Sequence, residues 1–224
     1  MNGYHYTAHH FVEGYRSSDK MLPGFNLVIL DVDSGVSLST AQMLLKDYKA
    51  LFATTKRSTP THNRFRIILP LSHVIKLNSV NYSKFMLNVF EWLPFEVDVQ
   101  TKDCARKWES FDGEHFYQDG ELLDAVLFIP ETKKQAEQQQ KIVDLASLNN
   151  LERWFLLNIS VGNRSNTLFR YACVLVDSGY DFNAAKNAIR IFNQKMKDPL
   201  SEEELQSTID VSVMEKILKR NMNA

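Results

Sequence analysis

Residues 26–35, with the sequence NLVILDVDSG, constrain the fold of this chain most strongly. The apolar run at residues 27–30 has the length of a strand, is rich in β-branched residues and ends in two aspartates. Side chains two positions apart on a strand point to the same face, so Asp31 and Asp33 should lie side by side while the valine between them turns inward. We therefore predict a buried strand that delivers two carboxylates to the edge of a sheet.

This pair of carboxylates has two interpretations. Side chains so close repel each other unless a cation lies between them, and oxygen ligands favour hard ions such as Mg2+ or Mn2+. Such ions complete their coordination shell with water and substrate phosphates. The alternative is a strand end at which two solvated acids open a turn at Gly35. The pattern by itself leaves both interpretations open.

Composition restricts the class of protein. The 224 residues, of which 44% are hydrophobic and 24% charged, are enough for one globular domain and a smaller one. No apolar run approaches the ~20 residues that span a bilayer, and the first residues lack the order of a signal peptide, so we expect a soluble, cytoplasmic protein without membrane contact. The formal net charge of −1 argues against non-specific coating of nucleic acid but permits local basic patches. Two cysteines without a CxxC pattern argue against a structural zinc site.

A basic stretch follows the acidic one. Lys56, Arg57, Arg64 and Arg66 place four fixed positive charges in residues 56–66, with no acid among them. This composition predicts an anion site. The alternative is a solvated edge strand, whose basic side chains discourage pairing with another chain.

A third carboxylate occurs in the stretch LPFEVDVQTKDCARKW, residues 93–108. Asp98 follows a short apolar segment, as Asp31 does, and could supply a third ligand to a metal site. The same stretch carries the cations Arg106 and Lys107.

Histidines gather in the opening segment. His5, His9 and His10 could bind a metal ion, but no matching carboxylate or cysteine lies nearby in the sequence. We therefore expect surface or packing roles for them.

The composition changes at residues 131–141, ETKKQAEQQQK, which are polar and free of large apolar side chains. We predict a linker, a flexible coil or a solvated helix, at residues 131–142 between a catalytic domain at residues 1–130 and a helical domain at residues 143–224. The second domain has helical periodicity throughout, with Ser201 and Glu204 placed for a capping box. Four short helices of this kind form a compact bundle.

Three stretches in order, the strand ending in DVDSG, TTKRSTPTHNRFRIILP and FEVDVQTKDCARKW, together resemble the archaeo-eukaryotic primase superfamily in its phage and plasmid primase-polymerase forms. That family has a DxD motif, a histidine in a loop of small residues before a strand, and a third acidic residue. The stretch from GNRSNTLFRYACVLVDSGYDF to PLSEEEL looks like the helical domain that follows the catalytic domain in such primases. The resemblance covers nearly the whole chain. It implies an α+β fold, in which a catalytic domain with an RRM-like, mostly antiparallel sheet precedes a small all-α bundle.

The resemblance also implies an activity. The chain would be a DNA primase that synthesises primers on single-stranded DNA from NTPs or dNTPs, with two Mg2+ or Mn2+ ions, in phage or plasmid replication. A replicative helicase, fused or separate, would be a partner, and the location would be the host cytoplasm if the chain is viral. The catalytic residues would be the metal-binding Asp31, Asp33 and Asp98, together with His62. Nucleotide-binding residues would be Lys56, Ser58, His62, Arg64, Arg66 and Arg106, and nucleic-acid-binding residues would be Lys107, Asn163 and Arg164.

This chain departs from the family at the second motif. The family histidine usually falls close to Arg57 and Ser58, whereas the histidine of this loop is His62. We favour His62 for the role in nucleotide binding, with Ser58 standing in its place if the role is lost. Asn163 has an alternative as well, because Gly162 could relax a turn in which Asn163 caps the next helix.

Two other functions remain open. LDVDSG also resembles the start of haloacid-dehalogenase-type phosphatases, in which the first aspartate is a nucleophile and the second a general acid. The chain lacks the paired-acid motif that this family has further on, and its C-terminal part would have no role there. The other alternative is a non-catalytic nucleic-acid-binding module of primase fold, which the displaced histidine favours and the three retained acids oppose.

Overall fold

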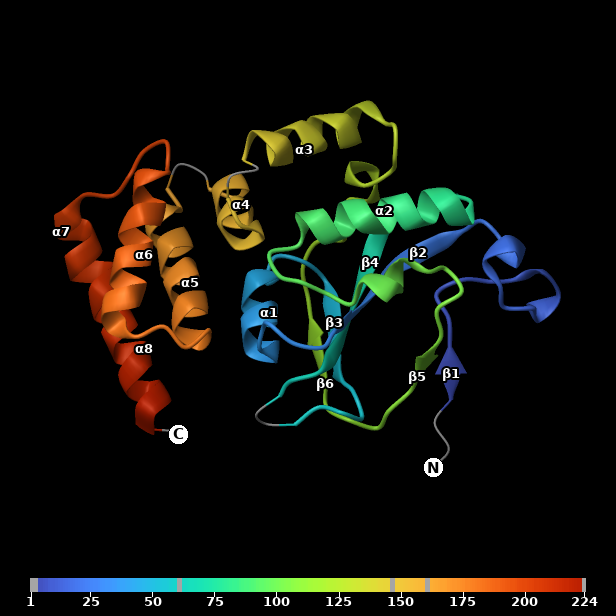
Figure 1. The fold of residues 1–224 in the computed structure, drawn as a ribbon, viewed down its shortest axis with the longest axis horizontal. Helices are drawn as coiled ribbons and strands as arrows, with labels where there is room; N and C mark the ends of the chain where they lie inside the picture. The colour runs from blue at the N-terminus through green and yellow to red at the C-terminus, as the bar shows by residue number, and fades with distance from the viewer. Residues whose placement is uncertain (1–3, 60–61, 146–147, 160–161, 223–224) are drawn as a thin grey trace. The chain divides into compact units, whose positions relative to one another are not determined.

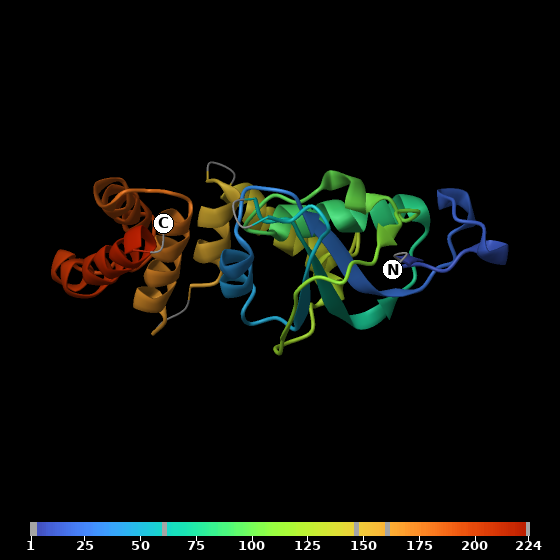
Figure 2. The ribbon, with the colours of Figure 1, turned by 90° about the horizontal axis from the view of Figure 1, so that it is seen from below.

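The computed structural model describes residues 4–59, 62–145, 148–159 and 162–222. The chain forms two compact units, Met1–Ser147 and Leu148–Ala224 (Figures 1 and 2). The first unit combines antiparallel sheets with helices, and the second is helical. The predicted α+β class is therefore confirmed.

A four-stranded sheet forms the centre of the first unit. Its strands are β2 (Phe25–Val32), β3 (Ala50–Thr54), β4 (Phe65–Ile75) and β6 (His115–Gln118), in the order β2-β4-β3-β6 with every neighbouring pair antiparallel. The apolar run predicted as a buried strand is β2, in which Val28, Ile29 and Leu30 are at most 2% exposed. The register of β2 and β4 places Asp31 opposite Arg66. The fold thus brings the acidic and the basic stretch side by side.

The helices α1 (Leu38–Leu44) and α2 (Ser79–Trp92) both begin at side-chain caps. The Ser37 hydroxyl accepts a hydrogen bond from the Thr40 N–H at 3.1 Å at the start of α1. Asn78 does the same for α2, where its Oδ1 accepts from the Asn81 N–H at 2.9 Å. α2 lies along β2 and β4 (Figure 1) and buries an apolar stripe of Tyr82, Phe85, Met86, Val89 and Trp92.

A second, two-stranded sheet lies beside the first. β1 (His5–Tyr6) pairs antiparallel with β5 (Trp108–Glu109), so the opening segment of the chain packs against the segment that carries Arg106 and Lys107. Short 3-10 helices complete this part of the unit: η1 (Val12–Gly14), η2 (Ser18–Lys20), η3 (Val99–Lys102) and η4 (Ala125–Leu127).

The stretch predicted as a linker, either a flexible coil or a solvated helix, forms the helix α3 (Lys133–Asp144), and the first compact unit is Met1–Ser147. α3 contacts its own unit through polar groups and buries one apolar side chain, that of Ile142. The Gln139 amide donates to Glu91 Oε2 at 3.0 Å, and Lys134 pairs with Asp124. Because such contacts need few apolar residues, the composition of the stretch gave little sign that it belongs to the first unit.

The second unit contains α4 (Asn150–Leu157), α5 (Arg164–Asp177), α6 (Phe182–Gln194), α7 (Glu202–Glu204), a π-helical segment η5 (Leu205–Asp210) and α8 (Val211–Met222). α5, α6 and α8 contact one another (Figure 2). Phe155, Tyr171 and Phe192 form an aromatic cluster in the core. The predicted capping box is present, with the Ser201 hydroxyl accepting from the Glu204 N–H and the Glu204 carboxylate accepting from the Ser201 N–H, both at 3.2 Å. In the described part of the chain, no helix is both long and apolar enough to cross a membrane.

Candidate active site

The centre of the candidate site is a partly buried ion pair between β2 and β4. Arg66 Nε donates to Asp31 Oδ1 at 2.7 Å, and the two side chains are 11% and 14% exposed. The strand register creates this pair, because Asp31 and Arg66 are direct cross-strand partners. A close pair so little exposed to water is screened weakly by salt.

Asp98 reaches the same place through the backbone. Its N–H donates to the Asp31 carbonyl at 2.8 Å, so the segment before η3 lies against the end of β2. Arg106 Nη2 lies 2.9 Å from Asp98 Oδ2 and 3.8 Å from Asp31 Oδ2. Arg106 therefore bridges the two carboxylates. The turn that returns Arg106 to this point is held by Asp103, whose carbonyl accepts from the Arg106 N–H at 3.0 Å.

Asp33 lies one residue beyond the end of β2. Val32 between the two aspartates is 1% exposed, as the alternation along a strand predicts. The Asp33 carboxylate is 56% exposed and lies 3.4 Å from Nη1 of Arg64, the residue just before β4. Each of the three predicted acids thus has an arginine partner, and the formal charges of the three pairs cancel.

Two aromatic residues that the sequence analysis did not single out hold Arg66 in place. Arg66 Nη1 donates to the Tyr6 hydroxyl at 2.8 Å and to the Glu109 carbonyl at 3.3 Å. The guanidinium carbon lies 5.6 and 5.9 Å from the ring centroids of Tyr6 and Trp108, which stack on each other. Contacts of this kind between a cation and aromatic rings are attractive. Only the pairing of β1 with β5 reveals them, since Tyr6 and Arg66 are far apart in sequence.

The loop between β3 and β4 is closed by hydrogen bonds. The Ser58 hydroxyl accepts from the Arg64 N–H at 3.1 Å, and the Thr55 N–H donates to the Arg64 carbonyl at 3.0 Å. The hydroxyl of Ser58 therefore supports the loop that positions Arg64. His62 is exposed, and its N–H donates to the Thr59 hydroxyl at 3.0 Å.

Three of the predicted cations remain available to a ligand. Lys56, Arg57 and Lys107 are exposed, and none of them forms an ion pair with another described residue. Lys56 and Arg57 belong to the loop that also carries Arg64, whereas Lys107 follows Arg106 directly.

The donor chemistry of the site suits a hard cation, because its acidic ligands are all carboxylates. As the side chains lie, the guanidinium groups of Arg66 and Arg106 occupy oxygens that a metal ion would need. No group of three or more His, Cys, Asp or Glu side chains within the described ranges is arranged to hold one metal ion. The residues thus fit a divalent cation by type, and binding requires the arginines to move aside.

The two predicted residues of the second unit have structural partners. Asn163 is the first residue before α5, but its side chain does not cap this helix; its amide donates to the Asn158 carbonyl at 3.2 Å. Arg164 forms an ion pair with Asp198 and donates to the Asp198 carbonyl at 3.1 Å. Arg164 therefore ties the start of α5 to the segment between α6 and α7. Gly162 before them has φ 94°, a left-handed conformation that glycine adopts readily.

Residues 152–216 match a family model described as Primase C terminal 1 (PriCT-1). No curated protein and no solved structure matches the chain. The match covers most of the helical unit, which is therefore a primase C-terminal domain. The match concerns residues 152–216 alone, so it identifies the helical unit and not the sheet-containing unit before it.

Proposed function

We propose that this protein is a DNA primase or primase-polymerase that starts chains on single-stranded DNA by two-metal nucleotidyl transfer. The observation that carries the proposal is the grouping of three acids at the end of one strand, each paired with an arginine. The primase C-terminal domain in the same chain supports it. NTPs or dNTPs and a DNA template are then the substrates.

Asp31, Asp33 and Asp98 are the residues that would hold Mg2+ or Mn2+. Bound divalent ions would activate a primer 3′-hydroxyl and stabilise the leaving pyrophosphate. Asp31 and Asp98 would act together, because a backbone hydrogen bond fixes one beside the other. Asp33, the most exposed of the three, would be the acid nearest to solvent and to an entering ion.

The arginines suggest how the site accepts its substrate. Their charges balance those of the acids, and the charges of a nucleoside triphosphate with two divalent ions also nearly cancel. We propose an exchange of partners, in which Arg64, Arg66 and Arg106 turn to the phosphate oxygens while the acids turn to the cations. Guanidinium groups suit this role because they bind phosphate oxygens in pairs. The exchange would leave no charge unpaired, which matters because an unpaired buried charge is strongly destabilising.

The loop between β3 and β4 would contact the same triphosphate. Lys56 and His62 are exposed on the loop that carries Arg64, so they can approach a phosphate without breaking an ion pair seen in the described structure. Ser58 would contribute through the shape of the loop, since its hydroxyl is engaged with the Arg64 backbone. Lys107, Asn163 and Arg164 would contact the template.

The two alternatives differ in what they require of Asp31. A phosphatase would need Asp31 as a free nucleophile, whereas both of its oxygens face guanidinium groups. A non-catalytic binding module would keep the arginine pairs permanently and would not bind metal ions there. A helicase partner and a phage or plasmid setting are predictions that follow from the resemblance alone.

The decisive experiment is incorporation of labelled nucleotides on primer-free single-stranded DNA with Mg2+ or Mn2+. The wild type is compared with an Asp31→Ala/Asp33→Ala variant. The matched control is Asp119→Ala/Asp144→Ala, which removes the same charge from exposed positions of the first unit. We expect metal-dependent products from the wild type and the control, and none from the site variant.

Two results would overturn the proposal. The first is the absence of products with either metal although the wild type binds single-stranded DNA, which indicates the non-catalytic module. The second is equal incorporation by the site variant, with its fold verified by circular dichroism. Hydrolysis of a phosphomonoester that depends on Asp31 would instead favour the phosphatase.

A further inference from the structure

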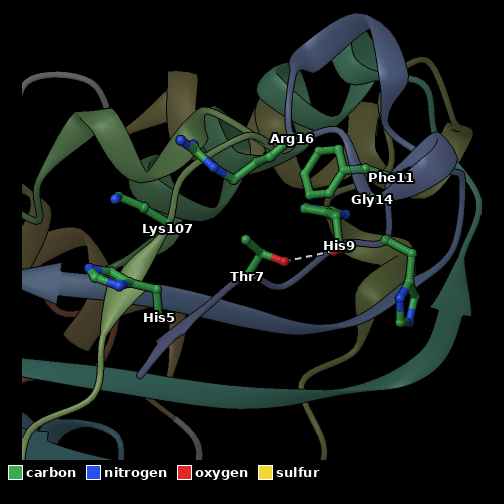
Figure 3. A pocket seen from close by; sticks show the side chains of 8 residues that line it. His5, Thr7, His9, Phe11, Gly14, Arg16 and Lys107 are labelled. Carbon is green, nitrogen blue, oxygen red and sulfur yellow. Dashed lines mark hydrogen bonds between the residues drawn. The ribbon is translucent and has the colours of Figure 1, made fainter. Parts of the chain in front are cut away.

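A cavity of about 390 Å³ lies in the first unit beside β1 and β5. Its titratable lining is basic throughout, since no carboxylate is among the residues that surround it. Figure 3 shows the nitrogen-bearing ends of Arg16, Lys107 and His5 along one side of this cavity. His9 and His10 also line it. We name it the basic pocket.

Hydrogen bonds fix the walls of the basic pocket. The Tyr4 N–H donates to the Ser110 hydroxyl at 2.8 Å, and the Ser110 N–H donates to the Tyr4 carbonyl at 2.7 Å. At the other end, Arg16 Nη1 donates to the Ala105 carbonyl. The opening segment of the chain is thus attached to residues 105–110 at Tyr4 and at Arg16. A cavity with fixed walls loses little entropy when a ligand enters.

His9 joins the basic pocket to the core of the first unit. It lines the pocket but is only 4% exposed. Its ring meets Phe25 and Tyr82 edge-on, with centroids 5.3 and 4.4 Å apart. Burial, together with neighbouring His10, lowers the pKa of His9 to about 4, so the imidazole is neutral at pH 7. His9 therefore contributes an uncharged wall, and the groups that can meet a ligand are Arg16, Lys107 and His5.

The basic pocket adjoins the candidate active site through one short segment. Arg106 pairs with Asp98, and Trp108 contacts the guanidinium group of Arg66. Lys107, between these two residues, lines the basic pocket. A group bound there would therefore lie next to the segment that holds two arginines of the site.

We infer that the basic pocket binds a phosphate group, carried either by a nucleotide or by the backbone of a DNA strand. The recognising groups are the ammonium of Lys107, the guanidinium of Arg16 and the imidazole of His5, whose nitrogen-bearing ends lie along one side of the pocket in Figure 3. Phosphate binding in this pocket does not involve the three acids. Only the identity of the molecule that carries the phosphate, a nucleotide or a DNA strand, rests on the proposed function. The pocket would hold a second phosphate beside the one at which the chemistry takes place.

The experiment measures equilibrium binding by the full chain in EDTA, without incorporation. The probes are inorganic tripolyphosphate and a fluorescent oligothymidylate, and the ring signals of His5 are followed by NMR. Lys107→Ala should weaken binding of the responding probe about tenfold, as expected for one hydrogen bond to a charged group. For the oligonucleotide, the salt dependence should also fall by about 0.7 in the log–log slope. Lys133→Ala is the matched control, because the Lys133 side chain is 93% exposed on α3.

His5→Leu is a second test that leaves the formal net charge unchanged. It should weaken binding of the same probe, while the thermal unfolding curve verifies that the variant is folded. If the variants weaken binding of tripolyphosphate and of a nucleoside triphosphate alike, the molecule that carries the phosphate is a nucleotide. A response confined to the oligonucleotide identifies the DNA strand.

Either of two outcomes would overturn the inference. One is binding of both probes by Lys107→Ala and His5→Leu as tightly as by the Lys133→Ala control. The other is saturable Zn2+ binding that shifts the ring signals of His5, His9 and His10 and is unaffected by phosphate. The Asp31→Ala/Asp33→Ala variant separates this inference from the proposed function, because it should lose incorporation and keep the phosphate response.

Discussion

Replacing Arg66 with methionine should strengthen metal binding and weaken the fold of the first unit at the same time. Methionine retains an unbranched side chain that can pack against the rings of Tyr6 and Trp108, but it cannot pair with Asp31. If arginine and metal compete for the Asp31 carboxylate, the variant frees an oxygen ligand. These two effects have opposite signs, so a general disruption of the unit would not produce both.

The structure gives the magnitudes. Removing one partner of a buried ion pair typically destabilises a protein by about 3–5 kcal/mol. Arg66 and Asp31 remain 11% and 14% exposed, and Arg106 still faces Asp31 at 3.8 Å, so we expect a loss of about 2–3 kcal/mol. A metal ion at Asp31 would no longer have to displace a charged hydrogen bond, which contributes about 1.5–3 kcal/mol. The dissociation constant for Mn2+ should therefore fall by about tenfold to a hundredfold.

The assay has two parts. Mn2+ binding without nucleotide is measured by electron paramagnetic resonance, with Arg153→Met in α4 as the control. Urea unfolding is followed by tryptophan fluorescence in a Trp154→Phe background, so that the signal comes from Trp92 and Trp108 in the first unit. Unchanged or weaker Mn2+ binding by the folded Arg66→Met protein would refute the competition between arginine and metal.

Three further predictions concern single side chains. Tyr6→Phe removes the hydroxyl that accepts from Arg66 and should lower the rate of nucleotide incorporation severalfold, with a loss of only about 1 kcal/mol in unfolding free energy; an equal rate would contradict a positioning role. The pKa of His9 is about 4 in the folded state and about 6.5 in the unfolded state. The unfolded chain therefore binds a proton first, and the free energy of unfolding should fall by about 3 kcal/mol as the pH falls from 6.5 to 4. His9→Leu should abolish this part of the pH dependence in urea titrations. Asp210→Asn removes the charge of the buried Asp210 carboxylate from its ion pair with Arg190, whose side chain is 19% exposed. It should destabilise the second unit by about 2–4 kcal/mol in thermal unfolding, whereas the exposed Asp198→Asn should have less effect.

Much of the fold follows from local rules. The apolar run before Asp31 predicted a buried strand, and the caps at Asn78 and Ser201 begin helices as their side chains indicate. The match to a primase C-terminal domain confirms the interpretation of the helical part. The roles of the candidate site residues, His62 among them, stay predictions. At residues 131–142 the composition left a flexible coil and a solvated helix open, and the structure has the helix α3 there.

By itself, the sequence determined which residues could be buried, which could begin a helix and which acids and cations the chain offers, because these properties depend on neighbours a few positions away. Only the tertiary structure decided which of them meet. The register between β2 and β4 sets Asp31 against Arg66, and the pairing of β1 with β5 encloses that arginine with Tyr6. Cross-strand partners distant in sequence are fixed by the packing of the whole unit, and no spacing along the chain specifies them.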